Sequence, residues 1–161
     1  MTAENVIPTI VSHGMGKTSD GIAATDWDRV HELALAVVNA DDSLDEESHR
    51  RELLKYLDEL TSKYGELPSL LATRADYIDD RVEAERLLVR AFEVAKSIDD
   101  TRNLCEISLS LADLYTSDRP RRVAARMWLD RARAHMSADD DVGWRESCRI
   151  EKRLDESAID E

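Results

Sequence analysis

The chain has 161 residues, with 35 acidic residues against 22 lysines and arginines and a formal net charge of −13. A negative sum of this size repels phosphate groups, so it disfavours nucleic acids and anionic membrane surfaces as partners. Five glycines and three prolines are few for this length, which disfavours turn-rich β architectures and favours helices.

Residues 1–24 contain three of the five glycines and no lasting apolar period, so we expect an irregular or disordered tail there. A helical domain is expected over residues 25–157, and residues 158–161 are expected to be disordered. Apolar periods and capping residues predict seven helices in this domain. These helices are expected at about 25–39, 43–64, 68–78, 81–98, 101–115, 119–136 and 139–154.

The links between these helices are only a few residues long, which predicts antiparallel αα-hairpins. The helix over 101–115 carries the most regular apolar stripe. In the helix over 119–136 the residues expected to face inward are Val123, Ala124, Met127, Trp128, Ala132 and Met136. The last helix has few apolar residues, which suits a terminal capping helix, and those expected to be buried are Trp144, Cys148, Ile150 and Leu154.

Two of the hairpins match each other at a spacing of about 40 residues. Ala75-Asp76-Tyr77-Ile78 matches Ala112-Asp113-Leu114-Tyr115 near the end of the first helix of each pair, and Asp99-Asp100 returns as Asp139-Asp140. A repeat of this length is typical of a solenoid, in which each unit buries its apolar face against the next.

The stretch from Ala91 to Arg102, continued by Leu109-Ser-Leu-Ala-Asp-Leu-Tyr115, resembles a tetratricopeptide-repeat array, and the resemblance extends from residue 66 to about residue 150. The resemblance implies an all-α fold of antiparallel αα-hairpins, stacked as a short right-handed solenoid with a C-terminal capping helix. In that family the first helix of each repeat lines a groove that takes a peptide from a partner protein. Carried over by position, the groove residues are Ala72, Asp76, Asp79, Glu106, Leu109, Asp113 and Thr116.

This lining is acidic, so we expect a non-catalytic adaptor or scaffold module that binds a basic or amphipathic peptide of a protein partner. The alternative for each acid is that it only keeps an exposed face solvated. We expect no enzymatic activity, no cofactor and no bound metal. An alternative is a self-associating structural domain, a homodimer with its seam near residues 26–64.

A helical metal protein is the less favoured alternative. Asp28-x-x-His31 and Glu46-x-x-His49 are paired carboxylate-x-x-His motifs on neighbouring helices, a pattern found in di-metal bundles. The segment from Gly14 to Thr18 ends like a phosphate-binding loop, but position 11 is Val where that loop needs its first Gly. We interpret it as part of the tail.

Only two cysteines occur, Cys105 and Cys148, without a CxxC pair. Their number and spacing predict reduced, buried thiols rather than a disulfide framework or a zinc module. The first residues lack the basic start and continuous apolar run of a secretory signal, which favours a cytoplasmic location.

Overall fold

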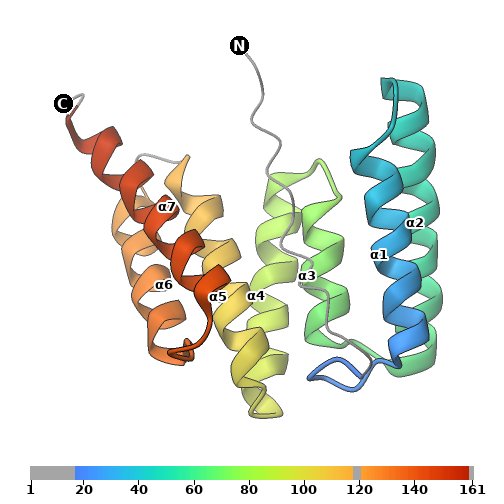
Figure 1. The fold of residues 1–161 in the computed structure, drawn as a ribbon, viewed down its shortest axis with the longest axis horizontal. Helices are drawn as coiled ribbons and strands as arrows, with labels where there is room; N and C mark the ends of the chain where they lie inside the picture. The colour runs from blue at the N-terminus through green and yellow to red at the C-terminus, as the bar shows by residue number, and fades with distance from the viewer. Residues whose placement is uncertain (1–16, 118–120, 160–161) are drawn as a thin grey trace. The chain divides into compact units, whose positions relative to one another are not determined.

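A computed structural model describes residues 17–117 and 121–159, the last three of these by their backbone alone. Within these ranges the chain forms seven α-helices and no strand, so the expected all-α class is confirmed. The helices are α1 (Ala24–Val38), α2 (Ser43–Tyr64), α3 (Pro68–Asp76), α4 (Arg81–Ser97), α5 (Thr101–Thr116), α6 (Arg122–His135) and α7 (Asp141–Ile159) (Figure 1). Residues 1–16 of the expected tail, the expected helix start at 118–120 and the last two residues lie outside the described ranges. Residues 158–159, which were expected to be disordered, belong to α7.

Four aspartates set the helix starts. Asp42, Asp80 and Asp100 precede α2, α4 and α5, and each carboxylate accepts backbone N–H bonds from the first turn. Asp140 does the same for the backbone N–H of Gly143 in α7, at 2.9 Å. These bonds satisfy donors that a helix start leaves unpaired, which explains why so short a chain holds many separate helices.

The chain divides into two compact units, residues 1–66 and 67–161. In the first unit α1 packs against α2, and Gly65 ends α2 with a φ of 84°, a conformation that favours glycine. The buried apolar side chains of the pair are Val30, Leu33, Ala34 and Val37 from α1, with Leu53, Leu57 and Leu60 from α2.

Side-chain hydrogen bonds also join α1 to α2. The carboxylate of Asp26 accepts hydrogen bonds from Lys63 Nζ at 2.7 Å, from the Tyr64 hydroxyl at 2.5 Å and from the Tyr56 hydroxyl at 3.3 Å. The bond from Lys63 is the main reason that the pKa of Asp26 is lowered. Asp26 therefore ties the start of one helix to the end of the other.

In the second unit, neighbouring helices pack in a regular order. Each of α3, α5 and α6 packs against the helix that follows it, α4 packs against α5, and α5 also contacts α3 and α7. Alanines are fully buried where helices meet, which lets their backbones approach closely. These alanines are Ala91 and Ala95 in α4, Ala112 in α5, and Ala125 and Ala132 in α6.

The inward stripe predicted for α6 was partly wrong. Trp128 and Ala132 are buried, but Val123 is 84% exposed and Met127 is 43% exposed. Ala125 and Leu129 are buried instead. Apolar residues cover more than one side of this helix, and packing against α5 and α7 selects the side that carries Ala125 and Leu129.

The last helix also differs from expectation. Ile150 and Leu154 are buried as predicted, whereas Trp144 is 39% exposed and Cys148 is exposed. Ser147 occupies the buried position next to Cys148. Cys105 is buried, so the prediction of buried thiols holds for one cysteine of the two, and both are free. In the part of the chain that the structure describes, no helix is long and apolar enough to cross a lipid bilayer.

Candidate functional site

The seven predicted groove residues divide by exposure. Asp76, at the end of α3, and Asp79, just after it, are exposed. Ala72, Glu106, Asp113 and Thr116 are half-buried, and Leu109 is buried, with 8% of the residue exposed. Leu109 therefore packs in the core of the second unit and offers little surface to a ligand.

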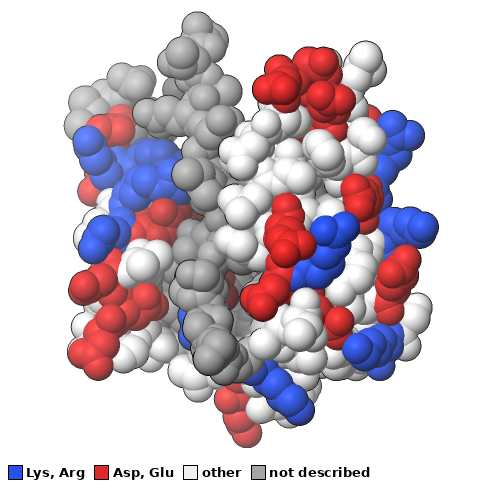
Figure 2. Space-filling model, turned by 45° about the vertical axis from the view of Figure 1, so that its right-hand side comes forward, with Lys and Arg blue, Asp and Glu red and all other residues white. Residues whose placement is uncertain are grey.

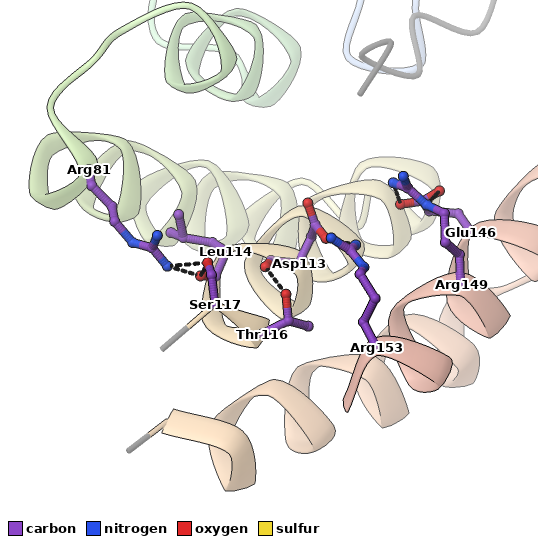
Figure 3. A network of polar contacts seen from close by, with 8 residues as sticks. All are labelled: Arg81, Asp113, Leu114, Thr116, Ser117, Glu146, Arg149 and Arg153. Carbon is purple, nitrogen blue, oxygen red and sulfur yellow. Dashed lines mark hydrogen bonds and ion pairs between the residues drawn. The ribbon is translucent and has the colours of Figure 1, made fainter. Parts of the chain in front are cut away.

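Asp113 on α5 forms an ion pair with Arg153 of α7 (Figure 3). The Thr116 hydroxyl donates a 2.6 Å hydrogen bond to the backbone carbonyl of Asp113. Figure 3 shows Arg153 extending from α7 toward α5, with its guanidinium against the carboxylate. Asp113 is thus largely neutralised by the protein itself.

Glu106 is partnered as well. Its carboxylate accepts a 3.0 Å hydrogen bond from Arg102 Nε, one helical turn earlier on α5. Such pairs within one helix stabilise by a few tenths of a kcal/mol and open readily to water.

Asp76 differs from the other groove acids because it has no ion pair or hydrogen bond among the described residues. Its pKa is raised to about 7, first by the surrounding protein and then by the negative charge of Asp113. The residue is nonetheless exposed, so water reaches the carboxyl and screens part of this effect. The structure thus brings Asp76 and Asp113 close enough to repel each other.

Two buried polar atoms near this pair of acids have no hydrogen-bond partner: the Tyr77 hydroxyl and Nε of Arg153. Tyr77 is 7% exposed. Burial, followed by the charge of Asp76, raises the pKa of Tyr77 to about 12, so its hydroxyl stays protonated near neutral pH. The Tyr77 hydroxyl lies in the field of Asp76, and Arg153 pairs with Asp113, so each of these two donor groups lies beside an acid.

Arg153 is the residue of this site that sequence reasoning missed. The helix that carries it was interpreted only as a cap, because its apolar cover is thin. Arg149 and Arg153 lie four residues apart and share one side of α7, and this spacing beside an acidic α5 was the available signal. Arg149 pairs instead with Glu146 on its own helix (Figure 3).

The other candidate sites of the sequence do not gain support. In the described ranges no group of three or more His, Cys, Asp or Glu side chains is arranged to hold a metal, around His31 and His49 or elsewhere. Gly14 and Gly16 of the phosphate-loop-like segment lie outside those ranges. The Thr18 hydroxyl donates to Asp20 and accepts the backbone N–H of Ile22, so it holds a turn before α1.

Acidic and basic side chains alternate over the face of the molecule seen in Figure 2, and neither sign covers it continuously. A charged site on this protein has to be found from unpaired groups rather than from the overall sign of the surface.

Comparison of the chain with models of protein families, with curated proteins and with solved structures found no match. The described part of the molecule is all-helical, and the chain forms two compact units.

Proposed function

We propose that this protein is a non-catalytic interaction module, which binds a basic or amphipathic peptide of a partner protein on the acidic face formed by α3 and α5. The observation that carries the proposal is the state of Asp76. It belongs to an exposed residue, has no cationic partner among the described residues, and lies within the field of Asp113. A lysine or arginine of a ligand would relieve this repulsion.

The proposal includes a tetratricopeptide-like packing of the second unit, as a short right-handed stack of αα-hairpins closed by α7. Two observations support it. Each first helix of a pair contacts its own second helix and the first helix that comes next, as α3 contacts α4 and α5. At the spacing of the repeat, three pairs of apolar residues are buried in both copies: Ala75 and Ala112, Leu88 and Leu129, Ala91 and Ala132.

The contacts of the predicted groove residues set their roles. Asp76 is the primary contact for a cation, because no internal cation competes for it in the described structure. Asp113 is a secondary contact, since a ligand would have to replace or share Arg153. Electrostatic recognition of this kind sets the rate of encounter and the register of the bound peptide more than its affinity, so we expect the module to bind its peptide reversibly. The expected location of this binding is the cytoplasm, as the sequence predicts.

The test uses the full chain and a displayed library of random peptides of about 15 residues, roughly four helical turns. Enriched peptides should be basic, and Asp76→Lys should weaken their binding about tenfold, which corresponds to about 1.4 kcal/mol. Their affinity should also rise as pH rises through about 7, because Asp76 ionises there.

The matched control is Glu59→Lys, an equal change of charge at an exposed position of α2 in the first unit. Asp113→Lys is not suitable because it would also break the ion pair to α7. Basic peptides that bind wild type, Asp76→Lys and Glu59→Lys equally well would refute the proposed face.

A second candidate function is self-association through the first unit. Three large apolar residues are exposed around the α1–α2 turn: Leu35 at 44%, Val38 at 37% and Leu44 at 80%. They lie within the segment predicted as a seam between copies. Exposed apolar side chains gathered in this way favour an interface.

A further inference from the structure

A second surface of unit 2 lies on α4 and α6, and it differs in chemistry from the acidic face. We call it the α4–α6 surface. Its residues are Val89, Phe92 and Lys96 on α4, with Met127, Trp128 and Arg131 on α6. The rings of Phe92 and Trp128 join the two helices, with centroids 4.9 Å apart and planes at 81°.

The apolar part of this surface is accessible. Val89 is 40% exposed and Met127 is 43% exposed. Val89 precedes Phe92 by three residues, and Met127 precedes Arg131 by four, so each neighbour pair shares one side of its helix. Each of the two helices therefore contributes one exposed aliphatic side chain to this surface.

Arg131 covers the aromatic pair. Its ζ-carbon lies 4.6 Å from the ring centroid of Trp128 and 5.9 Å from that of Phe92. Stacking of this kind restrains a guanidinium while its N–H groups point outward in the plane. Arg131 makes no ion pair within the described ranges, either with Asp130, which precedes it in the chain, or with Glu93 on α4. A restrained guanidinium with unused donors is suited to bidentate binding of a carboxylate.

Lys96 adds a second cation. It follows Phe92 by four residues and therefore lies on the same side of α4. Lys96 is exposed and has no acidic partner among the residues described. The surface thus combines two unpaired cations with two exposed aliphatic side chains, in a chain whose net charge is −13.

We propose that the α4–α6 surface is a second docking site, which binds an acidic amphipathic segment of a partner protein. Carboxylates of the segment contact Arg131 and Lys96, and its apolar side chains pack on Val89 and Met127. The overall negative charge does not prevent this binding, because salt at physiological strength screens exposed charges beyond about 8 Å. Since different helices carry the two sites, this inference does not depend on the acidic face.

The same peptide library, selected on the full chain, tests this site. A second enriched group should combine Asp or Glu with apolar residues at helical spacing. Arg131→Glu should weaken these peptides about tenfold or more, as truncation of an interface arginine does, and Lys96→Glu should weaken them less. Arg145→Glu is the matched control, an equal change of charge at an exposed position of α7.

Basic peptides from the first group should bind Arg131→Glu as they bind wild type, which separates this site from the acidic face. Helical circular dichroism of each variant should match that of wild type, because Arg131, Lys96 and Arg145 are exposed. Three results would overturn the inference: no acidic group enriched, an acidic group insensitive to Arg131→Glu, or sensitivity to Arg131 found only in binding to phosphatidylserine vesicles.

Discussion

At the scale of single residues, Asp76 shows how one carboxyl can be exposed and still be costly to ionise. The group has solvent contact, but surrounding protein and the charge of Asp113 raise its pKa to about 7. Arg153 forms an ion pair with Asp113. Asp76 is left without a cationic partner among the described residues.

The raised pKa of Asp76 predicts a dependence of stability on pH. In the unfolded chain this carboxyl titrates at its ordinary pKa of 3.8, whereas in the folded protein its pKa is raised to about 7. Between these values the folded protein keeps a proton that the unfolded chain has released, so rising pH lowers stability. Asp76→Asn removes this effect because the amide does not titrate.

The measurement is the melting temperature of wild type and Asp76→Asn from about pH 4 to about pH 8. Wild type should lose stability relative to the variant as pH rises to about 7, and the difference should then level off. Parallel curves over the whole range would show that the pKa of Asp76 is not raised.

At the scale of helices, α5 is the element on which the second unit depends. It contacts α3, α4, α6 and α7, and its apolar stripe was the most regular in the sequence. Ile107, Leu111 and Ala112 are almost completely buried along it. The partly wrong prediction for α6 has the same origin, since contact with α5 and α7 selects which apolar side of α6 is buried.

This difference between buried and exposed apolar positions predicts unequal effects of truncation to alanine. Leu111→Ala should lower the free energy of unfolding by about 2–5 kcal/mol, because it removes buried atoms and leaves a cavity. Val123→Ala, at a position that is 84% exposed, should change it by no more than about 0.5 kcal/mol. Chemical denaturation followed by circular dichroism measures both, and similar losses at the two positions would contradict the register of α6.

At the scale of the whole molecule, the two compact units carry different surfaces. The first presents Leu35, Val38 and Leu44 at its α1–α2 turn. The second carries the acidic face and the α4–α6 surface. A chain with two docking sites of opposite preference would act as an adaptor between two segments of partner proteins.

The candidate function of self-association makes a prediction at this scale. Asp41, Asp42, Asp45, Glu46 and Glu47 surround Leu44 in sequence, so two copies meeting there would repel each other at low salt. Sedimentation equilibrium should therefore show a dimer that strengthens with salt and that Leu44→Glu abolishes. A monomer at every protein and salt concentration would remove this candidate.

Particular residues show which features of the fold the sequence predicts. Low glycine and proline content, regular apolar periods and capping aspartates determined the helical class and most helix bounds, because these signals act within a few residues along the chain. Two helices end elsewhere than expected: α3 ends at Asp76 rather than near Ile78, and α7 continues to Ile159 rather than ending near Leu154. Asp42 caps α2, which begins at Ser43 as expected. The repeat matches Ala75 with Ala112, and both are buried.

The sequence by itself therefore determined the helices, their order and the acidic residues that α3 and α5 present. Only the tertiary structure decided that Arg153 neutralises Asp113, that Asp76 remains unpaired, that Val123 and Trp144 are exposed, and that Arg131 stacks on Phe92 and Trp128. The ion pair between Asp113 and Arg153 joins residues 40 positions apart, beyond the reach of a local sequence pattern. Local periodicity places a side chain on one face of its own helix, but the neighbouring helix decides which charge or ring it meets.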